Sequence, residues 1–321
     1  MRRMVPLILK VTISIALLFF AFRLVNFGAL QERLARLEFK WIAAALLILS
    51  IQFTLGSLRW YQIAIACGSE LSRTRALLYT LIGAFFNQVT PSTVGGDAVR
   101  MWLMARKTHS WKGAVYSVFI DRVVGLIWLA LLILVCLPLS LALIQDPVGR
   151  ATLILIGIGS VAGPIALFVI SHVGQTWFHH WRFTRHLAEL AAIVWKITAT
   201  ARVGGSIGAI SIIIHLLTIV VAWFCAKAIG SPLDLLNALL LIPPVLLISA
   251  IPVSIAGWGV REGAMVAAFT FAGLPDHDAL AISVLFGAGS FVIGAVGGLI
   301  WIFSGERGKI AMWPGNSTPS N

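Results

Sequence analysis

Three pairs of opposite charges occur inside or beside apolar stretches of this sequence. They are Asp97 with Arg100, Asp121 with Arg122, and Arg261 with Glu262. Ionised side chains are costly in hydrocarbon, so they usually pair with one another and mark functional sites. A nearby arginine lowers the cost of burying a carboxylate. The planar guanidinium fork also matches phosphate oxygens, so Arg100, Arg122 and Arg261 are candidate clamps for an anionic headgroup.

Polar side chains precede the first charged pair. The segment reads Asn87-Gln88-Val89-Thr90-Pro91-Ser92-Thr93. Two roles are open for its side chains: binding a headgroup, for which Asn87 is our candidate, or satisfying backbone groups that the break in the helix leaves free. A helix that resumes after Gly96 would also present unpaired N–H groups, which suit an anion.

A structural role is the alternative for all three charged pairs, which could simply lock helices together. His215 lies within an apolar run, and a hydrogen bond to a neighbouring helix is favoured over a proton relay. The sequence contains no HExxH, GxSxG, Walker A or cysteine-cluster motif. We therefore expect no catalytic residues, no metal and no cofactor.

The elements that must position these residues are membrane helices. Of 321 residues, 59% are hydrophobic and 11% are charged, whereas soluble domains carry about 25% charged residues. Runs of roughly twenty apolar residues are long enough to span a membrane. Six spans are predicted, near residues 5–25, 41–60, 114–141, 151–171, 204–226 and 279–303. The fold class is thus an all-α polytopic membrane protein.

Two further apolar regions are interrupted. Residues 76–89 are followed by 94–105, and residues 235–251 are followed by 262–273. The residues that break them are Pro91, Gly95, Gly96, Pro252, Gly257 and Gly259. Because proline removes a backbone donor and glycine loosens a helix, we interpret both regions as re-entrant helical hairpins. Two kinked spans are the alternative.

The distribution of basic residues predicts an orientation. With the N-terminus in the cytoplasm, the inner segments contain fifteen lysines and arginines and the outer segments contain six, as the positive-inside rule expects. Segment 22–40 mixes both signs and is predicted to be a short interfacial helix. The net charge of +12 then reflects anionic lipid and not nucleic acid, which we do not expect as a partner.

The same topology predicts an inverted repeat. One transmembrane domain would cover residues 1–305, with repeat 1 at about 5–145 and repeat 2 at about 146–305. Each repeat would hold two spans, a hairpin and a span, in opposite orientations. Paired broken helices of this kind are typical of transporters and place the substrate site near the midplane. Residues 306–321 would form a disordered cytoplasmic tail.

The two break regions together resemble the lysylphosphatidylglycerol synthase transmembrane-region family, also described as flippase-like, over about residues 5–305. The likeness is carried by Asn87-Gln88-Val89-Thr90-Pro91, Gly95-Gly96-Asp97 with Arg100, and Gly257-Trp258-Gly259-Val260-Arg261-Glu262 after Pro252. The resemblance implies that Asp97, Arg100, Arg261 and Glu262 are functional. Trp258 departs from the small or apolar residue that is frequent in the family.

In full-length relatives the membrane region moves an aminoacylated phospholipid between leaflets, and a separate soluble domain charges the lipid. This sequence lacks that domain, so the resemblance implies a stand-alone flippase for a lipid or lipid-linked substrate in the bacterial inner membrane, with both termini cytoplasmic. Membrane lipids with anionic or phosphate-bearing headgroups are the expected partners, and envelope-biosynthesis enzymes are potential ones. The rival hypotheses are a membrane enzyme acting on a polyprenyl-phosphate or phospholipid headgroup, and a non-catalytic partner of an envelope synthase.

Overall fold

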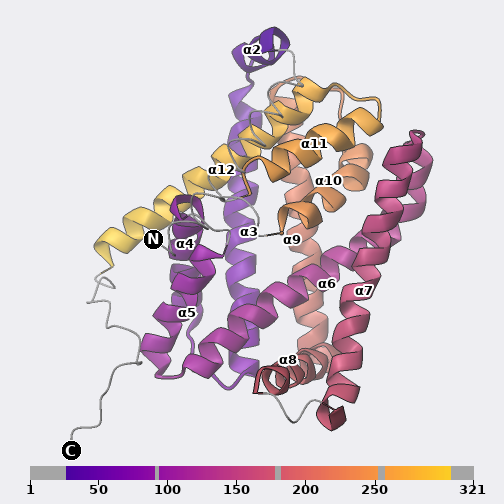
Figure 1. The fold of residues 1–321 in the computed structure, drawn as a ribbon. Coiled ribbons are helices and arrows are strands. Elements are labelled where there is room, and N and C mark those ends of the chain that lie inside the picture. Colours follow the sequence, from indigo (N-terminus) through magenta and orange to yellow (C-terminus); the bar gives the residue numbers. More distant parts are fainter. Residues whose placement is uncertain (1–26, 91–93, 178–181, 252–256, 305–321) are drawn as a thin grey trace, which may run out of the picture.

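The described part of the chain is built from α-helices. The computed structural model describes residues 27–90, 94–177, 182–251 and 257–304, and all elements within these ranges are helical (Figure 1). The predicted first span at 5–25 and the predicted tail at 306–321 lie outside the described residues.

Five of the described helices are long and apolar enough to cross a membrane. They are α3 (Phe39–Ala66), α6 (Trp111–Leu143), α7 (Pro147–Trp177, apolar through Ile170), α9 (Ala201–Ala228) and α12 (Asp276–Phe303). Each coincides with one of the predicted spans and extends it by a few residues at one or both ends. Five of the six predicted spans are therefore confirmed as long apolar helices.

Each interrupted region forms a pair of shorter helices that pack against each other. The first pair is α4 (Arg73–Val89) and α5 (Gly95–Thr108), and the second is α10 (Leu235–Ser249) and α11 (Val260–Phe271). The helices predicted on either side of each break are thus present. Pro91 and Pro252, which we expected to cause the breaks, lie outside the described residues.

The ends of the helices at the breaks have local causes. Thr90 ends α4 in an extended conformation, with φ −91° and ψ 147°, as expected for a residue that precedes a proline. At the second break Gly257 and Gly259 have φ values of 80° and 87°. Residues with a Cβ rarely adopt this left-handed region, so the two glycines are required by the backbone.

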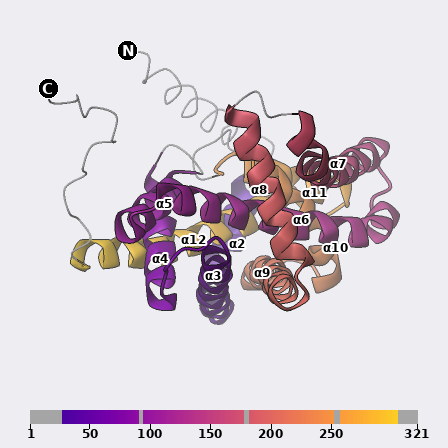
Figure 2. The ribbon, with the colours of Figure 1, turned by 90° about the horizontal axis from the view of Figure 1, so that it is seen from below.

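α3 and α9 pack side by side at one face of the bundle, and Figure 2 looks nearly along both of their axes. α6 packs against α5 and also against α10, whereas α12 packs against α11 and also against α4. Each long helix that follows a helix pair therefore contacts both pairs. α12 and α4 approach so closely that a Cβ on Gly297 would lie only 1.9 Å from the Leu81 carbonyl oxygen.

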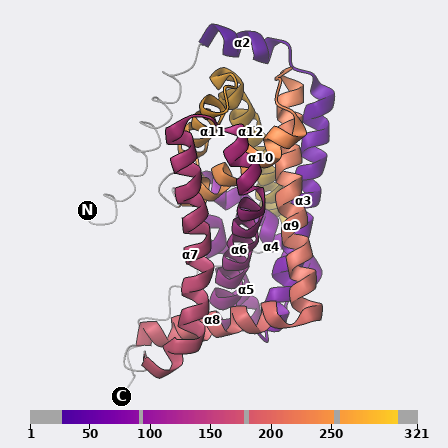
Figure 3. The same ribbon diagram turned by 90° about the vertical axis from the view of Figure 1, so that its right-hand side faces the viewer.

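Two helices lie across opposite ends of the bundle (Figure 3). One is α2 (Phe27–Ala35), in the segment predicted as an interfacial helix, and the other is α8 (Arg182–Ala199). The Arg33 side chain attaches α2 to α12, with Nε 3.0 Å from Oδ1 of buried Asp278. α8 lies between the predicted spans 151–171 and 204–226, where we predicted no span. It buries one face at a spacing of three residues, through Ala188, Ala191, Val194 and Ile197.

Candidate functional site

Five charged side chains from three helices converge between α3, α5 and α6. They are Arg59 of α3, Asp97 and Arg100 of α5, and Asp121 and Arg122 of α6. The structure therefore brings together two of the three charged pairs singled out in the sequence, and it adds Arg59 to them.

Asp121 accepts from two arginines. Arg59 Nε lies 2.9 Å from Asp121 Oδ1, and Arg100 Nη2 lies 3.4 Å from Asp121 Oδ2. Arg59 Nη1 also donates to the Ser211 hydroxyl of α9 at 3.2 Å. Asp121 is only 4% exposed, so its charge is compensated by these guanidinium groups and not by water.

Asp97 also accepts from two arginines. Arg100 Nη1 lies 3.2 Å from Asp97 Oδ1, as expected for residues one turn apart, and Arg122 Nε lies 2.6 Å from Asp97 Oδ2. We expected Arg122 to compensate its neighbour Asp121. Adjacent residues of a helix do not face each other, and Arg122 reaches across to α5 instead.

Close packing between α4 and α5 positions Asp97 and Arg100. A Cβ on Gly96 would lie 2.0 Å from the Gly83 carbonyl oxygen, and a Cβ on Gly95 would lie 1.8 Å from Thr90 Oγ1. Only glycine fits at either place. The Asn87 side chain accepts a hydrogen bond from Gly96 N at 2.8 Å, so Asn87 satisfies one of the free N–H groups at the start of α5.

The Arg100 side chain is held on several sides. Its guanidinium carbon lies 4.2 Å from the centroid of the Trp60 ring, which is fully buried. Its aliphatic stem passes Gly83, where a Cβ would lie 2.9 Å from Arg100 Cγ. The stacking, the two carboxylates and the missing Gly83 side chain fix the guanidinium group in one orientation.

Four of the five charged residues, Arg59, Arg100, Asp121 and Arg122, line a cavity of about 220 Å³, here called the arginine cavity. Its other walls come from α4 and from the middle of α3 and α9. Gln52 is the fourteenth of the 28 residues of α3, and Ile214 is the fourteenth of the 28 residues of α9. The cavity therefore lies half-way along α3 and α9. The complete lining is Gln52, Phe53, Gly56, Arg59, Thr80, Gly83, Ala84, Asn87, Arg100, Asp121, Arg122 and Ile214.

The arginine cavity is polar and incompletely satisfied. Three of its lining residues have a buried polar atom without a hydrogen-bond partner among the described residues: Gln52 Oε1, Thr80 Oγ1 and Arg100 Nε. Three guanidinium groups face two carboxylates, which leaves one net positive charge. The Arg122 side chain is 53% exposed, so the cavity is open on that side. Buried groups in this state attract water or an anionic ligand.

The third charged pair forms a separate and closed cluster. Glu262 accepts from Arg261 Nη2 at 2.6 Å, from the Ser283 hydroxyl at 2.9 Å and from Gly259 N at 2.6 Å. Arg261 Nε donates to Ser283 Oγ at 2.9 Å. Trp258 lies beside the arginine, with its ring centroid 5.0 Å from the guanidinium carbon. Arg261 and Glu262 do not line the arginine cavity, and their partners are supplied by α11, α12 and the break.

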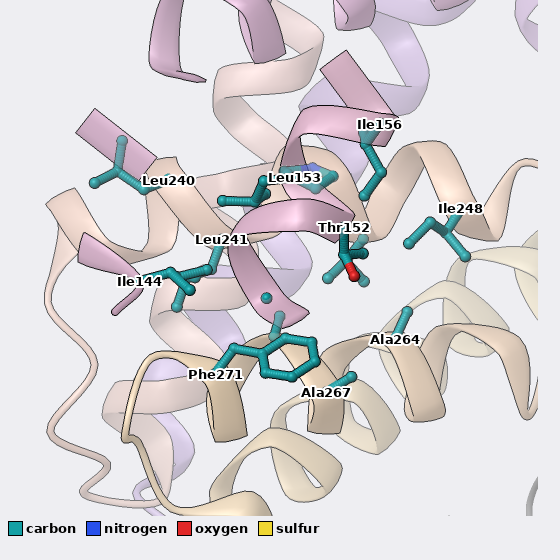
Figure 4. A pocket seen from close by; sticks show the side chains of 14 residues that line it. Ile144, Thr152, Leu153, Ile156, Leu240, Leu241, Ile248, Ala264, Ala267 and Phe271 are labelled. Atoms are coloured by element: carbon teal, nitrogen blue, oxygen red, sulfur yellow. The ribbon is translucent and has the colours of Figure 1, made fainter. Parts of the chain in front are cut away.

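A second cavity, of about 60 Å³, lies where α7 meets α10 and α11. Figure 4 shows its walls, in which Leu153, Ile156, Leu241 and Phe271 turn carbon atoms inward. Thr152 provides the hydroxyl seen in this view. A charged headgroup would lose its solvation here without compensation, so this cavity suits only apolar groups.

Sequence reasoning missed Arg59, Gln52 and Thr80. The predicted span 41–60 ended beside Arg59, which we therefore placed in an inner segment. α3 continues to Ala66, so Arg59 lies almost two turns inside the helix. The apolar run Ile63-Ala64-Ile65-Ala66 after Arg59 was the available signal. His215 agrees with its predicted role, since its Nε2 lies 3.0 Å from the Gly125 carbonyl oxygen of α6.

Comparison with known proteins supports the resemblance noted in the sequence. No curated protein matched the chain. The family model for the lysylphosphatidylglycerol synthase TM region matches residues 7–298, which is nearly the whole chain and includes both helix pairs and both charged clusters. With its long apolar helices, the chain is a multi-pass membrane protein, and it belongs to the lysylphosphatidylglycerol synthase TM region family.

Proposed function

We propose that this protein is a lipid translocator of the bacterial inner membrane that moves an anionic, phosphate-bearing lipid between leaflets. The observation that carries the proposal is the arginine cavity, whose lining lies half-way along α3 and α9 and whose charged cluster has one excess positive charge. A headgroup would occupy this cavity while its acyl or prenyl chains stay in lipid. The membership of a lipid-handling family supports the same direction.

The arrangement of helices supports an alternating mechanism. We propose that α4–α5 and α10–α11 are re-entrant hairpins that enter from opposite faces, within an inverted repeat whose termini are cytoplasmic. α6 follows the first helix pair and contacts α10 of the second pair, and α12 follows the second pair and contacts α4 of the first. In an inverted repeat these two contacts would be equivalent. In transporters of this type, the two halves move against each other around a central site.

The residues at and beside the cavity would have distinct roles. Arg122 would contact phosphate oxygens, because its side chain is partly exposed at the open side of the cavity, and Arg100 would contribute its positive charge from the cavity wall. Asp97 and Asp121 would hold the guanidinium groups in place, and Asn87 would hold the start of α5. For Arg261 and Glu262 we propose a different role, that of holding α11 against α12.

Leaflet exchange by the purified protein in liposomes tests this function. Fluorescent lipids with phosphate-bearing headgroups, including polyprenyl phosphate, would be followed by dithionite quenching. We expect headgroup-selective exchange that Arg122→Gln lowers at least tenfold, since a charged hydrogen bond contributes about 1.5–3 kcal/mol. Lys107→Gln is the matched control, because it removes a positive charge at an exposed position near the end of α5.

Three outcomes would count against the proposal. Normal exchange by a folded Arg122→Gln protein would remove the arginine cavity from the mechanism. Equal loss in Lys107→Gln would indicate a general effect of net charge. If no lipid moves although the protein is folded and inserted, the translocator function is wrong, and release of a product from radiolabelled lipid phosphate would point to an enzyme.

A further inference from the structure

A third cavity, of about 230 Å³, lies beside α2, at the end of the bundle opposite α8 (Figure 3). Its walls come from α2, from the residue that follows α9 and from the second residue of α12. They are Glu32, Arg33, Arg36, Ile229 and His277. Among the described helices α2 packs mainly against α12, so this cavity lies where α2 is attached to the rest of the protein.

Arg33 connects three elements at this point. Its Nε lies 3.0 Å from Asp278 Oδ1 in the first turn of α12. Its Nη1 donates to the carbonyl oxygens of Gly230 at 3.0 Å and Ile229 at 3.4 Å, just beyond α9. A guanidinium group suits this place, because carbonyl groups at the C-terminal end of a helix lack partners within the helix. One side chain thus straps α2 across the end of α9 and the start of α12.

His277 is directed at the same carboxylate. Its Nε2 lies 3.5 Å from Asp278 Oδ1, and its Nδ1 lies 3.5 Å from Asp276 Oδ1. Because the His277 side chain lines the cavity and is 22% exposed, protons from solvent can reach it. Asp278 is fully buried, so Arg33 and a protonated His277 would have to share one oxygen atom, Asp278 Oδ1.

The two carboxylates do not move with α2. Asp276 and Asp278 belong to the first turn of α12, as His277 does. They therefore remain beside the imidazole whether or not α2 is docked. Their negative charge favours a proton on His277 in both states, and the difference between the states comes from the charges that α2 brings.

α2 brings a net positive charge to the cavity. Its charged side chains there are two arginines and one glutamate: Arg33, Arg36 and Glu32. At the end of α9 the charged residue is Lys227, whose Nζ lies over the Trp223 ring. Docked α2 and a proton on His277 therefore repel each other, and by reciprocity each weakens the binding of the other.

We propose that α2 is a pH-sensitive strap, in which a proton on His277 displaces Arg33 from Asp278 and releases α2 from the ends of α9 and α12. Histidine is the side chain that ordinarily changes its charge between about pH 5 and 8, so the strap is closed at the upper end of this range and opens on acidification. In the predicted orientation this end faces away from the cytoplasm, so the strap would respond to the pH outside the cell. The proposal is independent of lipid translocation, because the docking of α2 can be measured by itself.

Hydrogen–deuterium exchange of the α2 amides tests the strap in the full-length protein in detergent. Exchange would be compared at about pH 8 and about pH 5.5, after correction for the intrinsic effect of pH. We expect the α2 amides to exchange at least about fivefold faster at the lower pH, since two like charges beside one carboxylate oxygen repel even in a water-like dielectric. Equal corrected rates at the two pH values would overturn the proposal.

Variants of His277 assign the effect to this side chain. His277→Gln cannot be protonated, so its α2 amides should exchange slowly at both pH values. His277→Lys carries a permanent charge, so they should exchange rapidly at both. His109→Asn is the matched control, because His109 is exposed at the end of α5 and has a φ of 53° that asparagine tolerates. This control should keep the wild-type pH dependence.

Arg33→Gln removes the side chain that protonated His277 displaces, so its α2 amides should exchange rapidly at both pH values. The proposal is overturned if His277→Gln keeps the wild-type pH dependence, because another group would then control α2. It is also overturned if α2 stays protected at the upper pH in a folded His277→Lys or Arg33→Gln protein. If either of these two variants does not fold, His277→Gln and the wild type still decide the question.

Discussion

Arg59 and Asp121 are separated by 62 positions in the sequence, yet Arg59 Nε lies 2.9 Å from Asp121 Oδ1. This ion pair joins α3 to α6, which carries Asp121 and Arg122 of the cluster. Asp121 also accepts from Arg100. One carboxylate thus connects α3, α5 and α6, and the geometry of the arginine cavity depends on it.

Replacing this carboxylate should destabilise the protein. In Asp121→Asn two guanidinium groups lose their charged partner, and breaking a buried ion pair costs about 3 kcal/mol. We expect a clear decrease in the thermal unfolding midpoint in detergent. Glu70→Gln, at an exposed position before α4, is the control and should unfold at the wild-type temperature. An unchanged midpoint for Asp121→Asn would show that the pairs contribute little.

The close approach of α4 and α5 predicts a steric effect. Gly96→Ala places a methyl group 2.0 Å from the Gly83 carbonyl oxygen, and forcing such helices apart costs about 1–3 kcal/mol. Gly263→Ala is the comparison within the other helix pair, because no atom lies within 4 Å of its added methyl group. The Gly96 variant should unfold at a lower temperature than wild type and the Gly263 variant should not. Equal midpoints would argue against tight packing at Gly96.

Substitutions of Arg122 and Arg261 should differ in their effects, the first on lipid exchange and the second on stability. Arg261→Gln leaves Glu262, which is fully buried, without its charged partner, so it should lower the unfolding midpoint. Arg122→Gln removes a side chain that is 53% exposed, and Asp97 keeps Arg100. It should unfold close to wild type while exchanging lipid slowly. If Arg122→Gln lowered the unfolding midpoint more than Arg261→Gln does, the roles that we propose for the two arginines would be wrong.

The attachment of α8 should depend on pH. Lys112 donates to the Glu189 carboxylate at 3.0 Å, and Tyr116 donates to it at 2.9 Å. These hydrogen bonds, that of Lys112 first, hold the pKa of Glu189 below its ordinary value of 4.5. Because the pKa of Glu189 is lower in the docked state than in the unfolded chain, the ionised carboxylate stabilises docking at pH values above the unfolded-state pKa. This contribution is lost as the pH falls through the pKa of the folded state. Amide exchange in α8, corrected for the intrinsic effect of pH, should therefore increase below about pH 4.5.

Glu189→Gln checks the cause of this loosening. The variant should exchange faster than wild type at pH 6 and should lose the extra acceleration on acidification. If it remains as pH-sensitive as wild type, another group controls the docking of α8.

Prediction from the sequence was most successful for features that lie within a single helix. Long apolar runs predicted five helices correctly, and the Asp97–Arg100 spacing correctly predicted an ion pair within one helical turn. Contacts between helices could not be predicted in the same way. Nothing in the spacing of Asp121 and Arg122 shows that they pair with Arg59 and Asp97, because those partners depend on how α3, α5 and α6 cross.

The charge balance of the arginine cavity has a consequence for energetics. Without a ligand the cavity carries one net positive charge, and with a monoanionic phosphodiester it carries none. A membrane potential would then act on the return of the empty carrier and not on the step that carries the lipid. One charge crossing the full field corresponds to about 2.3 kcal/mol per 100 mV. Under our proposal, a potassium diffusion potential should therefore change continuous turnover much more than a single loaded crossing.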